Sequence, residues 1–185
     1  MIAGNDKPAP LAWGAKVSPE FRTKVKRIAA RLDADPSWLM AAMAFETAET
    51  FSPAIHNAAG SGATGLIQFM PVTALSLGTN AAALAHMSAE AQLDYVEKYF
   101  RPWQGRLHNL GDVYCAILFP LAVGKRDDFV LFRKGERPAA RYRQNAGLDG
   151  NRDGTVTRGE AVAHIRAEYE KGLTAPHVWP RPNDN

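Results

Sequence analysis

The chain of 185 residues has one cysteine, Cys115, and this excludes an internal disulfide. Its neighbours are apolar, so we expect a buried thiol rather than a nucleophile. No apolar run is long enough to span a membrane, and Met1 to Lys16 lacks the basic and then apolar pattern of a signal peptide. These absences predict no stable membrane insertion and synthesis in the cytoplasm. Repeats are also lacking, and 46% hydrophobic residues suffice for one core, so we expect a single domain over residues 1–185.

Neither positive nor negative charge is in large excess. The net charge is +3 and the isoelectric point is near 9.1, with the basic residues scattered along the chain. This balance favours contact with anionic polymers but does not require nucleic-acid binding. We expect a monomer that binds no nucleic acid.

The pattern of apolar residues predicts helices joined by short turns. Ser18, Asp35 and Ser88 each precede an apolar stripe of helical spacing and can cap a helix, and a further helix over 110–119 stops at Pro120. No alternating run requires a sheet. The sequence therefore predicts an all-α fold.

The helix that Asp35 caps ends in a carboxylate. Apolar residues recur along it at spacings of three and four up to Glu46. Most glutamates at helix ends are solvated, which is the alternative interpretation. Burial beside this stripe would instead raise the pKa of the carboxyl, and a carboxyl that holds its proton at neutral pH can act as a general acid on a sugar acetal.

A small, glycine-rich segment follows. The stretch from Asn57 to Thr64 suits a turn whose backbone approaches a ligand, although plain linkers share this composition. Gln68 lies among apolar neighbours, so its amide needs hydrogen-bond partners. These are either its own backbone or the donors and acceptors of an N-acetyl sugar.

Between Met43 and Ala74 the chain combines Glu46-Thr47, then Phe51 and Pro53, and then the segment from Gly62 to Pro71. With this combination the chain resembles the lytic transglycosylases and goose-type lysozymes. The resemblance implies an all-α, lysozyme-like domain in which Glu46 is the catalytic acid and base. The residues that it implies for sugar binding are Thr47, Gly65, Gln68 and Phe69.

The chain departs from the family pattern in two places. Two residues are inserted between Glu46 and Phe51, and Glu49 lies within that interval as a rival acid or a second carboxylate. The tyrosine that family members carry in a later helix is missing from 118–124. Tyr114 and Tyr142 are candidates to replace it, and Phe119 can fill the space without a hydroxyl.

A second motif lies near the C-terminus, over residues 149–160. It has oxygen ligands at positions 1, 3, 5, 7, 9 and 12 and glycine at position 6, which is the pattern of an EF-hand calcium loop. The predicted Ca²⁺ ligands are Asp149, Asn151, Asp153, Thr155, Thr157 and Glu160. A polar surface turn is the alternative. Because sensor EF-hands come in pairs and one loop is found, we expect a structural clip between helices over 137–144 and 158–171.

Together these features predict an enzyme that cleaves the β-1,4 bond between N-acetylmuramic acid and N-acetylglucosamine in peptidoglycan glycan strands. The product would come from transglycosylation or from hydrolysis. Because the N-terminus lacks the pattern of an export signal, the resemblance fits a bacteriophage endolysin or virion-borne lysozyme that acts on the wall in the periplasm or from the virion. The alternatives are a calcium-stabilised wall-binding or virion structural module without activity, and a chitin-cleaving enzyme.

Overall fold

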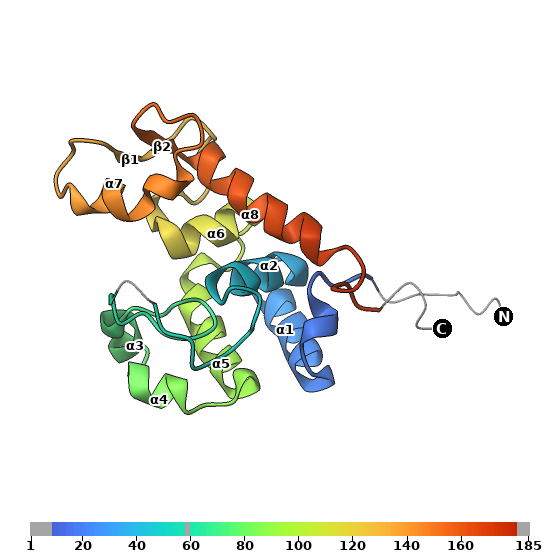
Figure 1. Cartoon of the computed structure of the whole chain (residues 1–185). Coiled ribbons are helices and arrows are strands. Elements are labelled where there is room, and N and C mark those ends of the chain that lie inside the picture. The colour runs from blue at the N-terminus through green and yellow to red at the C-terminus, as the bar shows by residue number, and fades with distance from the viewer. Residues whose placement is uncertain (1–8, 58–59, 181–185) are drawn as a thin grey trace.

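The computed structural model describes residues 9–57 and 60–180. It is 53% helix and 7% strand, so the predicted mainly α-helical class is confirmed, with a small two-stranded sheet in addition (Figure 1). In chain order the elements are η1 (Gly14–Lys16), α1 (Pro19–Leu32), α2 (Pro36–Glu46), α3 (Pro71–Ser76), α4 (Ala81–Ala85), α5 (Ala89–Phe100), η2 (Arg101–Trp103), α6 (Leu110–Leu118), η3 (Pro120–Ala122), β1 (Val130–Arg133), α7 (Ala140–Asn145), η4 (Ala146–Leu148), β2 (Thr155–Thr157) and α8 (Arg158–Gly172).

The helix starts follow the capping residues. The side chains of Ser18, Asp35 and Ser88 each accept a hydrogen bond from a backbone N–H in the first turn of α1, α2 and α5. This satisfies one of the donors that a helix start leaves unpaired. Asn109 caps α6 in the same way. The predicted starts of these helices are therefore confirmed.

Helix α2 lies at the centre of the core and packs against α1, α6 and α8. Every residue from Leu39 to Ala44 is buried, so the helix is enclosed on all sides and not along one stripe alone. A helix that is apolar all round has no solvated face. Glu46, at the C-terminal end of this helix, is only partly exposed.

The two-stranded sheet was not predicted. β1 pairs antiparallel with β2, and the register shifts between Val130 and Phe132. Strands of four and three residues are too short to show an alternating pattern. Because β2 covers positions 7 to 9 of the predicted calcium loop, the sheet ties that loop to β1.

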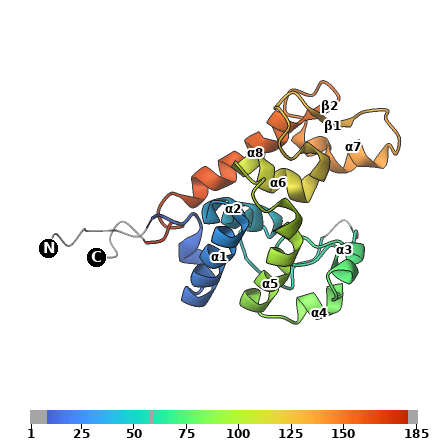
Figure 2. The same cartoon turned by 180° about the vertical axis from the view of Figure 1, so that it is seen from behind.

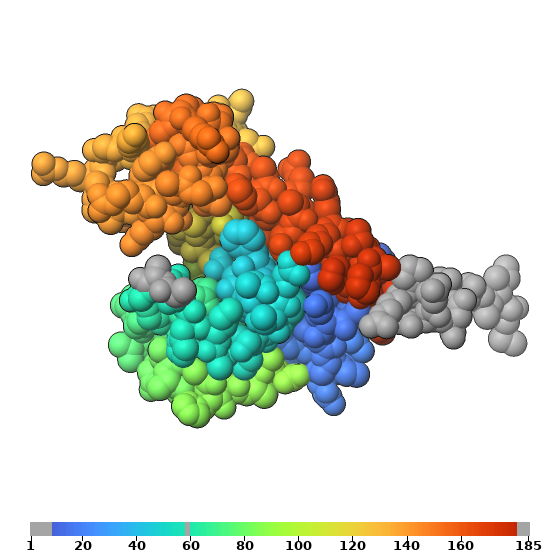
Figure 3. Space-filling model, in the orientation of Figure 1, coloured from blue at the N-terminus to red at the C-terminus, as the bar shows by residue number. Residues whose placement is uncertain are grey.

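Figures 1 and 2 show how the sheet is placed. β1, α7, η4 and β2 form what we call the sheet lobe, residues 130–157, at one end of the molecule, and α8 runs from it toward α1. Near the far end of α8, Leu11 and Trp179 exchange backbone hydrogen bonds of 2.7 and 3.1 Å. The surface is hollowed between the sheet lobe and the part of the chain that holds α3 to α5 (Figure 3).

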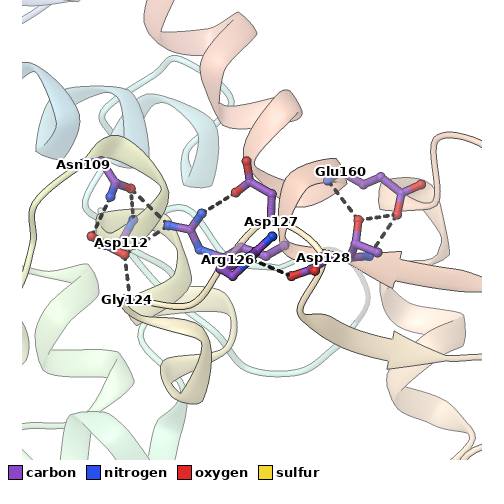
Figure 4. A network of polar contacts seen from close by, with 9 residues as sticks. Asn109, Asp112, Gly124, Arg126, Asp127, Asp128 and Glu160 are labelled. Carbon is purple, nitrogen blue, oxygen red and sulfur yellow. Dashed lines mark hydrogen bonds and ion pairs between the residues drawn. The ribbon is translucent and has the colours of Figure 1, made fainter.

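A buried ion pair connects α6 to the start of α8, next to the sheet lobe (Figure 4). Arg158, the first residue of α8, donates to Asp112 of α6 at 3.1 Å and to Asp127 at 2.6 Å. The Asp112 carboxylate also accepts from the backbone N–H of Gly124 at 2.8 Å and from the Asn109 side chain at 2.8 Å. Removing one partner of a buried pair leaves an uncompensated charge. The network therefore fixes α6 relative to the start of α8.

In the described ranges no helix is both long and apolar enough to cross a membrane. Cys115 is buried and unpaired, as predicted.

Candidate active site

Glu46 is the last residue of α2, and its carboxyl has no hydrogen bond or ion pair to any residue that the structure describes. Burial among apolar neighbours makes the charged form costly. This burial raises the pKa of Glu46 from 4.5 to about 7. The residue still keeps part of its surface exposed. The site thus offers a carboxyl that is accessible and holds its proton near neutral pH.

Two tyrosine side chains lie near this carboxyl. Burial first, and then the charge of Glu46, raises the pKa of Tyr99 to about 12 and lifts the pKa of Tyr114 above its ordinary value. Both phenols therefore lie near the carboxyl. The ring of Tyr114 meets Phe45 edge-on at 5.4 Å, and the Tyr99 hydroxyl donates to the Ala116 carbonyl at 2.7 Å.

The two tyrosines proposed to replace the missing one have separate positions. Tyr114 lies near Glu46, but it is only 2% exposed, so it backs the site and does not form its surface. Tyr142 donates its hydroxyl to Asp149 Oδ2 at 2.6 Å and so belongs to the predicted calcium loop. Of the two, Tyr114 alone is close enough to influence the acid.

Glu49, the rival acid, points elsewhere. It follows α2 in a left-handed backbone conformation, with φ of 64°, and its carboxylate forms an ion pair with Lys171 of α8. Burial alone accounts for the raised pKa of Glu46, so no second carboxylate acts on it. The structure separates the two glutamates into an unpaired carboxyl and a paired one.

Thr47 supports the site through hydrogen bonds to the backbone at the end of α2. Its hydroxyl donates to the Met43 carbonyl at 2.7 Å and accepts from the Phe51 backbone N–H at 3.0 Å. The residue has no exposed surface. The prediction that Thr47 contacts substrate is therefore corrected. Its hydroxyl fixes the chain where α2 ends.

The glycine-rich turn is held by a residue that the sequence did not single out. Gln92 of α5 is fully buried, accepts from the Leu66 backbone N–H at 2.6 Å, and donates to the carbonyls of Pro53 at 3.0 Å and Leu84 at 2.9 Å. Gly65 has φ of +83°, and a Cβ there would lie 2.3 Å from the Gln92 side-chain oxygen. Gly65 thus serves close packing against Gln92. No local pattern reveals Gln92, because its partners are distant in sequence.

The structure bears out one of the two interpretations offered for Gln68, in which the amide bonds to its own backbone. Its Nε2 donates to the carbonyls of Gly65 at 3.2 Å and Ile55 at 3.4 Å, so the amide braces its own turn. Within the described ranges Oε1 has no partner and remains an acceptor for a ligand. Phe69 is 1% exposed and meets Tyr99 edge-on at 6.2 Å, so it supports the site from within the core. Residues 58 and 59 of the predicted turn lie outside the described residues.

The predicted calcium loop is folded by its own polar groups. Asp153 accepts from the Thr155 backbone N–H at 2.7 Å, and Asn151 accepts from the Asp153 N–H at 2.9 Å. Glu160 accepts from the N–H and hydroxyl of Thr157 at 2.9 and 2.8 Å, which forms a capping box at the start of α8. Hydrogen bonds within the loop therefore hold it against the start of this helix.

One buried side-chain oxygen of the loop lacks a hydrogen-bond partner. Asp149 Oδ2 accepts from Gly154 at 2.9 Å, while Oδ1 is buried with no hydrogen bond. In residues 9–57 and 60–180 no three His, Cys, Asp or Glu side chains converge in this conformation. The ligand types nevertheless fit Ca²⁺, and a cation would satisfy the unpaired oxygen. The helix before the loop, α7, starts at Ala140 and not at 137, after Pro138.

No family model, curated protein or solved structure was found that matches this chain. The case for a function therefore rests on the residues and their geometry.

Proposed function

We propose that this protein cleaves the glycan strands of peptidoglycan, with Glu46 as the catalytic acid and base. The observation that supports this most is the accessible, unpaired carboxyl of Glu46, whose pKa burial raises to about 7. A general acid works best when its pKa lies near the working pH. The family resemblance around Gly62 to Pro71 names the bond, which is the one between N-acetylmuramic acid and N-acetylglucosamine.

In the first step Glu46 donates its proton to the glycosidic oxygen. The bond between C1 of the muramic acid and that oxygen breaks, the N-acetylglucosamine leaves as an alcohol, and positive charge develops at C1. Gln68 Oε1, which has no partner in the described ranges, would accept a hydrogen bond from an acetamido N–H. The tight packing of Phe69 and Tyr99 keeps this turn fixed beside the acid.

In the second step the Glu46 carboxylate takes a proton from the group that attacks C1. If this group is the sugar's own C6 hydroxyl, a 1,6-anhydro ring forms, and if it is water, the product is a reducing end. The pairing of Glu49 with Lys171 supports the first route, because hydrolysis by two carboxylates needs a free second one. We therefore favour a lytic transglycosylase.

We further propose that Ca²⁺ binds the loop through side-chain oxygens of Asp149, Asn151, Asp153 and Glu160, the backbone carbonyl of Thr155 and, through water, Thr157. The ion would stabilise the folded state by its binding free energy and take no part in cleavage. The unpaired Asp149 Oδ1 supports this assignment.

Mass spectrometry of the soluble products tests the proposal. Purified protein and purified peptidoglycan are incubated with calcium, and fragments lighter by one water at the muramic end are expected. Ordinary reducing ends would indicate a hydrolase. No soluble product from peptidoglycan would favour the wall-binding module instead, and fragments from chitin alone would move the substrate to that polymer.

A further inference from the structure

A pocket of about 380 Å³ lies between η3, β1 and α7. Its walls are mostly apolar and come from Leu118, Phe119, Leu121 and Phe132. Leu121 is 74% exposed, so its side chain is open to a ligand at the edge of the pocket. Two polar residues of α7, Arg141 and Asn145, complete the wall. The pocket is large enough for part of a ligand and combines apolar surface with one cation.

The pocket lies beyond the end of the helix that backs Glu46. Leu118 follows Tyr114 by four residues on α6, so the two side chains share one face of that helix one turn apart. Figure 3 shows the hollow between the sheet lobe and the opposite side of the molecule, with the chain near residue 110 at its back. Helix α6 thus connects the pocket, through Leu118, with Tyr114, whose pKa responds to the charge of Glu46.

The cation at the pocket has no counter-ion. Arg141 is exposed, and nothing in the described ranges forms an ion pair or a side-chain hydrogen bond with its guanidinium. It belongs to a group of five unpaired, exposed cations within 130–145, where Glu136 is the one acidic residue. The five are Arg133, Lys134, Arg137, Arg141 and Arg143. In contrast, Lys24 and Arg31 on α1 are neutralised by Asp94 and Glu97 of α5.

We infer that this pocket binds the peptide stem of peptidoglycan, with a stem carboxylate on Arg141 and the methyl-bearing lactyl and alanyl part on Leu121 and Phe132. The inference rests on the proposed function, since it names the part of the same substrate that contacts the sheet lobe. A planar guanidinium matches a carboxylate in two parallel hydrogen bonds. The side-chain Nδ2 of Asn145 donates to the Arg141 carbonyl at 2.9 Å. Its Oδ1 would accept a hydrogen bond from a peptide N–H.

The experiment compares two substrates that differ only in the stem. One is intact peptidoglycan, and the other is the same glycan after an amidase has removed the peptides. Arg141→Ala is tested beside Arg143→Ala, which removes the same charge from the same helix but does not line the pocket. Leu121→Ala is a second pocket variant, and because Leu121 and Arg141 are both exposed, neither change should prevent folding.

For Arg141→Ala we expect kcat/KM on intact peptidoglycan to fall about tenfold, the usual effect of one charged hydrogen bond. Its rate on stem-free glycan should equal that of the unchanged protein, and Arg143→Ala should act normally on both. Equal losses on both substrates, or no loss at all, would overturn the inference and leave the proposed function intact. If the unchanged protein cleaves neither substrate, the proposed function fails. The pocket is then tested alone by calorimetry, which compares the binding of a disaccharide that carries its peptide with the binding of the same disaccharide without the peptide. Tighter binding of the peptide-bearing form that Arg141→Ala abolishes would support the inference, and equal binding of both forms would refute it.

Discussion

The carboxyl of Glu46 has no charged partner, so its protonation depends on burial alone. If its acid form starts the reaction, cleavage needs the proton that it holds below a pKa of about 7. We predict that kcat/KM falls as the pH rises above about 7, in proportion to the loss of the protonated form. Initial rates of peptidoglycan solubilisation between pH 5 and pH 9, where folding is checked separately, measure this. A rate that keeps rising to pH 9 would argue against an acid with a raised pKa.

The same burial affects stability. The folded state holds this proton more tightly than the unfolded state, so between pH 4.5 and about 7 the free energy of unfolding falls as the pH rises. In Glu46→Gln the side chain does not titrate, so this fall in the free energy of unfolding does not occur. We predict that the variant and the unchanged protein are equally stable near pH 4, and that the variant is more stable by about 1–2 kcal/mol at pH 8, an estimate reduced for partial solvation. Urea unfolding at both pH values tests it, and an identical difference at the two would contradict burial as the cause.

How much the sequence could predict also differs from residue to residue. Glu46 is predicted from its place at the end of an apolar helix together with the family resemblance, and its burial is as expected. Thr47 and Phe69 share the same motif, yet both are buried, because a motif marks residues that support a site as well as residues that touch a ligand. Gln92 could not be found, because its three hydrogen bonds join α5 to segments 8, 26 and 39 residues away.

Among the secondary-structure elements, the starts of α1, α2, α5 and α6 were predictable because a single side chain caps each of them. The sheet was not, since β1 and β2 exist through pairing with each other and not through local pattern. α2 is buried on every face because α1, α6 and α8 surround it, which a stripe in the sequence does not reveal.

The turn between α2 and α3 depends on α5 through Gln92. Replacing this residue by leucine keeps the volume but leaves the Leu66 N–H and the Pro53 carbonyl without the partner that Gln92 supplies. The Leu84 carbonyl still accepts from the Met87 backbone N–H at 3.1 Å. We predict that Gln92→Leu lowers the free energy of unfolding by about 2–4 kcal/mol and reduces cleavage, since the turn that carries Gln68 loses its support. Gln144→Leu, at an exposed position of α7, is the matched control and should change stability by less than about 0.5 kcal/mol. Denaturant unfolding of both variants decides the matter, and equal effects would remove the special role of Gln92.

At the scale of the whole molecule, the calcium loop and the Arg158 network lie at adjacent positions at the start of α8. An ion at the loop would therefore hold the sheet lobe to α6 and α8. We predict that a chelator lowers the melting temperature by about 5–10 °C relative to calcium at 100 times its Kd, and that it lowers cleavage at temperatures well below melting much less.

Asp149→Asn is the control for this effect, because it removes one ligand charge and keeps the shape of the side chain. Its melting temperature should respond little to the chelator. Superimposable melting curves of the unchanged protein with excess calcium and with excess chelator would rule out the structural role of the ion.

The account of the whole molecule depends on one acid, so the most direct test is the cleavage of purified peptidoglycan at pH 6 by Glu46→Gln, with Glu49→Gln and the unchanged protein beside it. All three should be fully folded at the temperature of the assay, which thermal unfolding at pH 6 checks. We predict that Glu46→Gln releases fragments about 10²–10⁴ times more slowly, as expected for loss of a general acid, while Glu49→Gln, which only breaks an exposed ion pair with Lys171, stays active. Full activity of Glu46→Gln together with an inactive Glu49→Gln would contradict the account and transfer the role of the acid to Glu49.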